Sequence, residues 1–356
     1  MIILESMETT FFTKQDGGIF DEDIVPELRK LAKENLHFSD TSNIGGALQI
    51  DGCNWTMSAI VGITLGIPLV TTIDGFDVDW NGFDRYIKFK KISFLPGVIG
   101  LTDILAKAGY EQRFLIGSDK KFAGRDLFFY THGNVIIKDL NYYKKIGKIP
   151  EDYHVFWGFE DEKLYQFAKE ELIALSSSSK PFNLIMLTVD THFPNGYLSE
   201  TCKKNSLFDK QYKNVLSCAS KQLYAFIEWI KKQPFYKNTT IVIFGDHLFM
   251  DDGTLIPRNA KRRIYNVFIN SPIKPLKEKN RQFSNLDMFP TILDSLNVKY
   301  NSQGLGFGRS LFKDTQTLIE KYGFDKLNQE INKKSKEYYI FWEENKISRL
   351  QLVIHN

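Results

Sequence analysis

The apolar residues of this chain fall into two kinds of stretch, short continuous runs and longer segments in which they recur every three or four positions. Short runs rich in β-branched and aromatic residues predict buried strands, and the periodic segments predict amphipathic helices. Strands are predicted at residues 2–4, 113–116, 182–189, 241–244 and 265–269. Helices are predicted at residues 21–34, 55–65, 101–109, 161–175, 211–232 and 287–296, whereas residues 133–160 are expected to form loops and short helices.

Strands and helices alternate along most of the chain. This order is typical of an α/β fold in which helices cover both faces of a mostly parallel sheet. The sequence shows no repeat and no linker that would divide the chain. We therefore expect one large α/β unit, followed by a charged and aromatic segment, residues 316–356, to which the sequence assigns no role.

Polar residues follow directly after the run at 241–244. Gly245 ends the run, and Asp246 and His247 come next. In open α/β sheets, ligands bind at the carboxyl ends of the strands, and a carboxylate beside an imidazole suits a divalent cation such as Zn²⁺ or Mn²⁺. Taken alone, the pair is equally compatible with a structural role, so the metal hypothesis depends on ligands from elsewhere in the chain.

Three more polar residues lie at comparable positions. Glu5 follows the first strand, His192 follows the strand 182–189, and Thr56 lies near the N-terminus of the helix 55–65. A helix N-terminus favours a phosphate or an alkoxide, although a Thr there is also a common helix cap, and a His after a strand also braces loops. One metal site would explain why all these residues lie at such positions.

The predicted site holds one divalent metal ion, Mn²⁺, Zn²⁺ or Mg²⁺. Its ligands are Glu5, Thr56, Asp246 and His247. A bound ion lowers the pKa of a Thr hydroxyl and so makes an alkoxide nucleophile available at neutral pH. Thr56 is therefore predicted to be both a metal ligand and the nucleophile.

Arg125 and His192 are the predicted partners of the substrate. Arg125 follows the strand 113–116 and offers a guanidinium that clamps a phosphate through two hydrogen bonds. The alternative for Arg125 is a surface ion pair with Asp126. His192 is expected to hold a phosphate ester or to serve its leaving group.

The composition narrows the classes of partner. The 46 basic and 43 acidic residues are too balanced for a nucleic-acid binder, and no basic stripe is present. Aromatic residues make up 14%, which fits either a well-packed α/β core or a cleft that faces sugar or lipid. Lysine-rich patches at 88–91 and 142–145 are either solvated faces or contacts with an anionic membrane surface. No stretch of about 18 apolar residues would span a membrane, and no signal-peptide pattern is present.

Three cysteines are present, Cys53, Cys202 and Cys218. Cys202 and Cys218 form either a disulfide, in an oxidising compartment, or two unpaired thiols, in a cytoplasmic protein. Cys53 has no evident partner. The spacing of the cysteines leaves both possibilities open.

The sequence contains, in this order, the motifs E-S-M-E-T-T-F-F, N-W-T-M-S-A-I-V, F-A-G-R-D-L-F, T-V-D-T-H-F-P-N-G-Y and G-D-H-L-F-M. Through these motifs, residues 1–315 resemble the phosphoglycerol transferases of the alkaline phosphatase superfamily. The likeness is greatest to the branch that modifies osmoregulated periplasmic glucans and smaller to the lipoteichoic acid synthases. The resemblance implies an alkaline-phosphatase-like three-layer sandwich. It also implies a catalytic domain at 1–315 and a C-terminal extension at 316–356.

A reaction is implied by the same resemblance. In that family, a metal-bound Thr takes glycerophosphate from phosphatidylglycerol and passes it to a sugar hydroxyl. The matching residue here is Thr56, and the family's other metal ligands match Glu5, Asp246 and His247. The implied partners are thus a phosphatidylglycerol donor and a glycan acceptor of the cell envelope.

Further positions match the family's motifs. His192 corresponds to the His of T-H-x-P, and Arg125 to the basic residue of F-A-G-[KR]-D. The family's paired cysteines correspond to Cys202 and Cys218, which favours the disulfide. One departure is Ala123, where the lipoteichoic acid enzymes have a Trp, so recognition of the glycerol is expected to differ.

The resemblance implies that the protein acts at a membrane surface, in the periplasm or on the extracytoplasmic face of the inner membrane. Family members usually carry several N-terminal transmembrane helices, and this sequence has none. We expect a fragment, a soluble form or a chain anchored by a separate subunit. The start of the sequence inside a predicted strand favours a missing upstream segment.

Three rival interpretations remain. A sulfatase would share the fold but needs the motif C-x-P-x-R, and the sequence C-N-W-T-M at 53–57 lacks the Pro and the Arg. A phosphoethanolamine transferase also uses a Thr and a similar metal site, and it is the main alternative, although such enzymes are richer in cysteine. A non-catalytic domain that binds glycan or lipid head groups is the third, and the complete set of predicted ligands around Thr56 argues against it.

Overall fold

The computed structural model describes residues 1–356 except 71, 74–75, 78–92, 205–206, 252 and 344–356. The lysine-rich patch at 88–91 and the last part of the predicted C-terminal extension therefore lie outside the described residues. All structural statements below concern the described part of the chain.

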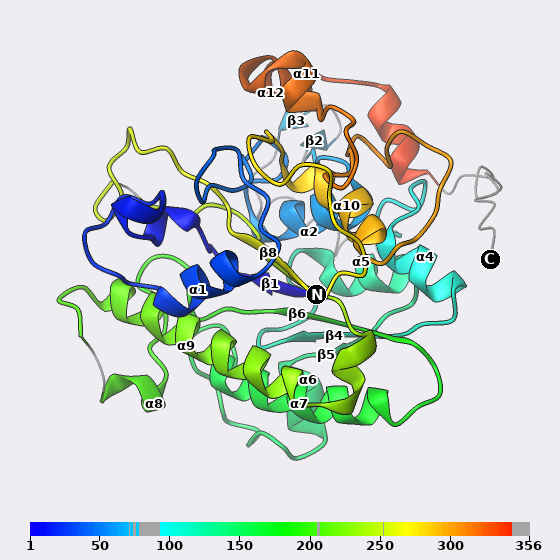
Figure 1. The fold of residues 1–356 in the computed structure, drawn as a ribbon. Helices are drawn as coiled ribbons and strands as arrows, with labels where there is room; N and C mark the ends of the chain where they lie inside the picture. Colours follow the sequence, from blue (N-terminus) through cyan, green and yellow to red (C-terminus); the bar gives the residue numbers. More distant parts are fainter. Residues whose placement is uncertain (71, 74–75, 78–92, 205–206, 252, 344–356) are drawn as a thin grey trace.

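A six-stranded sheet runs through the centre of the protein, in the order β5-β4-β6-β1-β7-β8 (Figure 1). Neighbouring strands are parallel, except that β8 is antiparallel to β7. The strands are β1 (Ile2–Leu4), β4 (Glu111–Ile116), β5 (Ile136–Lys138), β6 (Phe182–Leu187), β7 (Ile241–Gly245) and β8 (Asn266–Ile269). A separate antiparallel pair consists of β2 (Thr72–Ile73) and β3 (Phe76–Asp77).

Helices cover both faces of the large sheet (Figure 1). On one face lie α1 (Pro26–Glu34), α6 (Leu140–Lys145), α7 (Asp161–Ser176) and α9 (Gln211–Lys231). On the other lie α2 (Thr56–Leu65), α4 (Leu101–Lys107), α5 (Arg125–Thr131) and α10 (Met288–Ser295). Ile2 and Leu4 of β1 pack into the first core and Ile3 into the second, as the alternation of side chains along a strand requires. The predicted three-layer α/β sandwich is confirmed.

Strand β1 lies in the middle of the sheet, between β6 and β7. Ile2 pairs with Met186 of β6 and with Ile243 of β7. All of β1 is buried, which explains why its sequence is a continuous apolar run. The N-terminal ammonium of Met1 donates to the carbonyl of Leu184 at 2.7 Å. The residue after β1 therefore emerges at the carboxyl edge, flanked by the ends of two neighbouring strands.

Most predicted elements are confirmed, and two predictions are wrong in part. The helix predicted at 21–34 begins only at Pro26, since a Pro, with its fixed φ and no N–H, suits the first helical position. Residues 133–160, predicted as loops and short helices, also contain β5, whose residues are exposed or half-buried. The β-branched run at 135–137 is shorter than the four to eight residues by which a strand is usually identified, so β5 was missed.

The C-terminal extension contains α11 (Leu318–Tyr322), α12 (Phe324–Ile331) and the 3₁₀ helix η6 (Glu337–Trp342), at the top of Figure 1. Ile319 and Leu327 pack with Ile50, Cys53 and Leu286 in a small apolar cluster. The extension thus adheres to the loop that leads into α2. The domain boundary near residue 315 remains a prediction.

Cys202 and Cys218 form a disulfide with an S–S distance of 2.02 Å, which links the short helix α8 (Glu200–Lys203) to α9. The pairing implied by the resemblance is therefore confirmed, and Cys53 is buried and unpaired. None of the helices in the described part of the chain has both the length and the apolar character needed to cross a membrane.

Candidate metal centre

The register of two neighbouring strands places Glu5 and Asp246 side by side. Leu4, the last residue of β1, pairs with Gly245, the last residue of β7. Glu5 and Asp246 each directly follow one of these residues. The N–H of Asp246 donates to the carbonyl of Leu4 at 3.0 Å. A Cβ at Gly245 would lie 2.1 Å from the carbonyl oxygen of Met7, so only glycine lets the chain after β1 pass this close to β7.

The end of β6 fixes the backbone of Glu5 from the other side. The N–H of Glu5 donates to Oγ1 of Thr188 at 2.9 Å, and Oγ1 of Thr191 donates to the carbonyl of Glu5 at 2.6 Å. Ser6 has a left-handed φ of 51°, which turns the chain immediately after Glu5. The two threonines were not singled out in the sequence, because their role depends on a strand neighbour that sequence alone does not reveal.

Thr56 reaches the same point from the second layer. It is the first residue of α2, and its Oγ1 lies 3.3 Å from Oε2 of Glu5 and 3.5 Å from Nε2 of His247. The alternative that Thr56 merely caps the helix is wrong, because Trp55 is the capping residue and Ser58 bonds to its backbone. The hydroxyl of Thr56 instead faces the carboxylate and the imidazole.

Three buried side chains converge beside Thr56. Glu5, Asp246 and His247 each offer a ligand atom, and these atoms lie within 4.8 Å of one another. Nε2 of His247 is 3.3 Å from Oε1 of Glu5 and 3.4 Å from Oδ2 of Asp246. Nδ1 of His247 lies 2.9 Å from the carbonyl of Leu248, which suits donation of its proton there and leaves Nε2 facing the centre.

The donor set fits a divalent cation. Oδ1 of Asp246 accepts hydrogen bonds from the N–H groups of Ser6 and His247, whereas its buried Oδ2 has no hydrogen-bond partner among the described residues. A buried carboxylate oxygen left in this way needs compensation by a cation. Two carboxylates, an imidazole nitrogen and a hydroxyl are ligands that Zn²⁺ and Mn²⁺ accept.

The crowding of these groups shifts their protonation. Burial opposes ionisation of Glu5, but the charge and hydrogen bond of His247 prevail and lower the pKa of Glu5 to about 2. Burial, together with the charge of Glu5, raises the pKa of Asp246 to about 7. Burial disfavours the imidazolium of His247, yet Asp246 and Glu5 prevail and raise its pKa to about 10. The site thus stabilises positive charge, which is what cation binding requires.

His192 lies on the turn after β6 and is half-buried. Its Nδ1 lies 2.8 Å from the carbonyl of Phe193, and its ring centroid lies 4.8 Å from that of Trp157. The charge of His192 makes a smaller contribution, after that of His247, to the lowered pKa of Glu5. Trp157 gave no signal in the sequence, because it lies in a segment without periodicity.

Arg125 is the first residue of α5 and is buried, so the alternative of a surface ion pair does not hold. Its Nη1 donates to Oγ of Ser118 at 2.9 Å, and its guanidinium lies 5.0 Å from the ring centroid of Phe122. The Phe122 ring contacts Trp157, which in turn contacts His192. Arg125 and His192 therefore belong to one continuous cluster of side chains that includes two aromatic rings.

Two comparisons of sequence agree with this geometry. A family profile described as Sulfatase matches residues 86–298. Phosphoglycerol transferase I from Escherichia coli strain 55989 is 34% identical over 311 residues, which cover 86% of this chain and 38% of that protein. The chain thus spans well under half the length of this relative.

Solved structures with the same fold include a protein of the alkaline phosphatase superfamily from Vibrio parahaemolyticus, with a TM-score of 0.66 and 22% identity. The match covers 88% of this chain and 68% of that one. The lipoteichoic acid synthase LtaP from Listeria monocytogenes matches with a TM-score of 0.66 and 18% identity, over 88% of this chain and 75% of that one. These similarities support the alkaline-phosphatase-like fold.

Proposed function

We propose that this chain, which belongs to the Sulfatase family, is a metal-dependent phosphoglycerol transferase that moves glycerophosphate from phosphatidylglycerol to a sugar hydroxyl of a cell-envelope glycan. The single observation that carries the proposal is the position of Thr56. Its hydroxyl lies at the start of a helix, within 3.5 Å of atoms of Glu5 and His247. The 34% identity to a protein named phosphoglycerol transferase I supports the choice of group transferred.

The metal ion would be held by Glu5, Thr56, Asp246 and His247. When bound, it supplies Lewis-acid chemistry, which lowers the pKa of the Thr hydroxyl and polarises a phosphoryl oxygen. The N-terminal end of α2 adds N–H groups and a positive dipole to the side where the phosphate would lie. The buried carboxylates of Glu5 and Asp246 would balance the charge of the ion.

In the proposed first step, Oγ1 of Thr56 attacks the phosphorus of phosphatidylglycerol. Oγ1 gives up its proton as it forms a new bond to phosphorus, the bond from phosphorus to the diacylglycerol oxygen breaks, and that oxygen takes up a proton. In the second step, an acceptor hydroxyl loses its proton, attacks the same phosphorus and releases the oxygen of Thr56, which takes up a proton again. His192 is assigned to bind the phosphate or move these protons, and Arg125 to stabilise the developing charge.

Sulfatase chemistry is disfavoured by the position of Cys53. The thiol is buried in the apolar cluster with Ile50 and Leu286, and it is not among the grouped ligands Glu5, Asp246 and His247. Burial raises its pKa far above the ordinary range for a thiol, so the reactive thiolate is not accessible. A Thr nucleophile that forms a phosphodiester agrees with phosphoryl transfer instead.

The disulfide between Cys202 and Cys218 supports a place outside the cytoplasm, because such bonds persist in oxidising compartments. We place the protein in the periplasm or on the extracytoplasmic face of the inner membrane, where both phosphatidylglycerol and envelope glycans are available. A membrane surface is the proposed source of the donor.

Intact-mass spectrometry after incubation with Mn²⁺ and phosphatidylglycerol tests the proposal, with Thr56→Ala as the control. We expect a mass gain of one glycerophosphate that maps to Thr56 and is absent from the variant. Mn²⁺ binding by the variant, measured by calorimetry, shows that the remaining ligands still hold the ion. An adduct formed only from phosphatidylethanolamine would assign the alternative head group, and no adduct from either lipid with metal bound would refute the transferase.

A further inference from the structure

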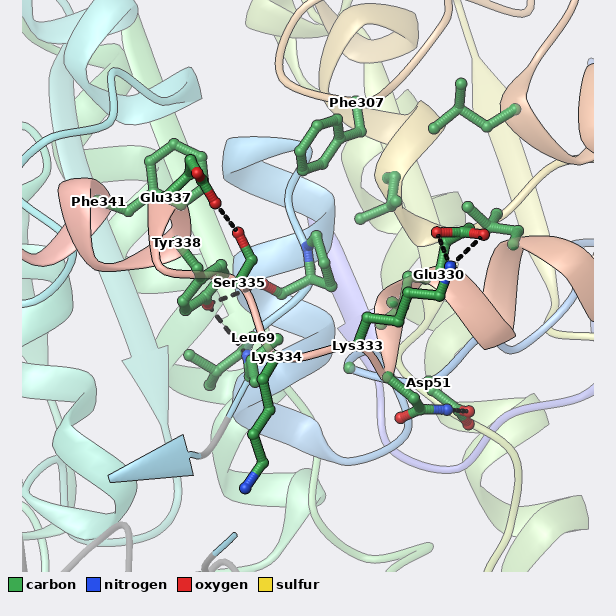
Figure 2. Close-up of a pocket in the computed structure, with 18 of the residues that line it drawn as sticks. Asp51, Leu69, Phe307, Glu330, Lys333, Lys334, Ser335, Glu337, Tyr338 and Phe341 are labelled. Carbon is green, nitrogen blue, oxygen red and sulfur yellow. Dashed lines mark hydrogen bonds and ion pairs between the residues drawn. The ribbon is translucent and has the colours of Figure 1, made fainter. Parts of the chain in front are cut away.

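A cavity in the described part of the chain lies outside the metal centre. It has a volume of about 1200 Å³ and is bounded by the loop before α2, residues 68–70 and the C-terminal extension. In Figure 2, Leu69, Tyr338 and Phe341 gather on one side, Glu330 and Lys333 lie on the other, and Phe307 lies above them. Small-molecule pockets usually enclose roughly 300–1,000 Å³, so this groove is large enough for an extended ligand.

The groove is a fixed part of the fold, because hydrogen bonds join the extension to the catalytic unit. The N–H of Asp51 donates to Oδ1 of Asn328 at 2.9 Å. The hydroxyl of Tyr338 donates to the carbonyl of Pro68 at 2.9 Å and accepts from the N–H of Val70 at 3.0 Å. The extension is therefore held against the loops on both sides of α2.

The groove also adjoins the nucleophile. Asn54 and Trp55 line it, and Trp55 is the residue directly before Thr56. A ligand bound in the groove would thus lie against the turn that begins α2. The groove and the proposed nucleophile therefore share the turn at residues 54–55.

The most exposed large apolar side chains that line the groove are aromatic. Phe307, Tyr322 and Tyr339 are 44%, 53% and 44% exposed, whereas the aliphatic Val70, Leu318 and Ile331 are half-buried and Leu69 and Leu286 are buried. Acyl chains would need open aliphatic walls. Exposed rings instead match the apolar C–H faces of pyranose sugars and leave the polar edges of the sugar to hydrogen bonds.

The charged residues of the groove nearly balance. Four lysines line it against three carboxylates, those of Asp51, Glu330 and Glu337. Lys326 and Lys333 both pair with Glu330, Asn332 donates to Asp51, and Ser335 donates to Glu337. A surface with balanced and internally paired charges complements a neutral ligand better than an anionic one.

We propose that this groove binds a neutral oligosaccharide, and that it is the acceptor subsite from which a sugar hydroxyl reaches the phosphorylated Thr56. The link to catalysis rests on the proposed function, whereas sugar binding by the groove does not. The C-terminal extension thereby acquires a role as the outer wall of the acceptor site. Carboxylate, amide and hydroxyl groups of the groove hydrogen-bond the sugar edges.

The test uses the full chain and a linear neutral gluco-oligosaccharide. Phe307→Ala and Tyr322→Ala remove exposed rings of the groove, and Tyr130→Ala, a 72% exposed tyrosine on α5 that does not line it, is the matched control. Calorimetry measures sugar binding, and a coupled assay measures diacylglycerol release and transfer to the sugar separately. Both groove variants are expected to weaken sugar binding about tenfold, the size expected from one ring contact, and to slow transfer at low sugar concentration in the same proportion.

The outcomes separate the two proposals. Wild-type sugar binding in both groove variants would overturn the acceptor subsite. A raised KM for phosphatidylglycerol vesicles with unchanged sugar affinity would also overturn it and would assign the groove to the lipid. If no Thr56 adduct forms with either lipid, but the groove variants still lose sugar binding relative to Tyr130→Ala, the groove remains a sugar site and only the transferase proposal fails.

Discussion

Asp161 and Asp190 form a buried acidic pair that shapes the turn carrying His192. The two oxygens of Asp161 accept hydrogen bonds from the N–H groups of Val189, at 2.8 Å, and Asp190, at 3.1 Å. Asp190 in turn accepts from the N–H of Asp161 at 3.1 Å and from Ser199 at 3.0 Å. These bonds tie the start of α7 to the loop after β6, so they hold the imidazole of His192 in position.

The acidic pair predicts a pH effect on stability. Burial raises the pKa of Asp161 to about 7 against hydrogen bonds that lower it, while the unfolded value is near 3.8. Because the folded pKa is the higher one, this contribution to stability is full below pH 4 and is lost as pH rises through about 7. Each pH unit in that window costs on the order of 1 kcal/mol per proton.

Asp161→Asn should flatten this dependence. The free energy of unfolding in urea, measured with a chelator at several pH values between 4 and 7, should fall less steeply with rising pH than in the wild type. Asp209→Asn, an exposed residue, is the control. Parallel curves for wild type and Asp161→Asn would contradict the assignment.

At the scale of single residues, the sequence identifies candidate site residues when they directly follow a buried strand. Glu5, Asp246 and His247 were found because each comes directly after a buried run, and strand ends meet at one edge of the sheet. Trp157 and Thr188 could not be found, because their roles arise from neighbours that only the tertiary structure supplies. The metal-binding and catalytic assignments themselves remain predictions.

Helix α2 is the element that carries the proposed nucleophile, and its first turn is closed by Ser58. Oγ of Ser58 accepts from the N–H of Trp55 at 3.1 Å and donates to the carbonyl of Trp55 at 2.8 Å. Gly62, one turn further, lets the helix approach η5 (Asn285–Asp287), since a Cβ there would lie 3.1 Å from Cβ of Asn285. Nδ2 of Asn285 donates to the carbonyl of Asp246 at 2.8 Å. The helix is thereby placed against the metal centre.

Ser58→Ala should therefore loosen the position of Thr56. We expect a loss of about 1 kcal/mol in the free energy of unfolding, typical of a lost helix cap, and a roughly tenfold slower formation of the Thr56 adduct. Thr64→Val, which removes the hydrogen bond from Oγ1 to the carbonyl of Ile60 in the same helix, is the control. An equal loss of adduct rate in both variants would show that the effect is global.

Element boundaries were predictable where apolar patterns are long. The period of α9 and the buried run of β7 identify both elements directly. Strand β8 was predicted, but its antiparallel direction was not, because the sequence of a strand that is buried along its whole length is the same for either direction. The short helices of the extension lacked a long period and were missed.

On the scale of the whole molecule, the Cys202–Cys218 disulfide fastens a surface segment to the core. Cys218 is a buried residue of α9, and Cys202 belongs to α8. The disulfide therefore closes a loop that runs from α8 to α9. A loop of this length is expected to stabilise the fold by about 3 kcal/mol.

The double variant Cys202→Ser, Cys218→Ser should lose about that free energy of unfolding. Reductant should destabilise the wild type to a similar extent and leave the variant unchanged, which serves as the internal control. Equal stability of wild type and variant would show that the cross-link is dispensable for the fold.

The layered architecture follows from the alternation of strands and helices, but the strand order does not. β1 lies between β6 and β7 because it pairs with strands that are 183 or more residues away in the sequence. No local sequence pattern encodes such distant pairing. The groove under the C-terminal extension was equally inaccessible to sequence reasoning, because aromatic residues at 307, 322 and 339 come together only in the folded chain.

The central place of β1 determines the order of events during synthesis. The strand that precedes Glu5 is made before its partners at Met186 and Ile243, which leave the ribosome much later. Contacts this distant in sequence form slowly, and a growing chain keeps the corresponding edges open until they form. The candidate cation site is therefore completed only when β7 pairs with β1, because Asp246 and His247 directly follow β7, so a translation product truncated before β7 lacks two of the proposed ligands.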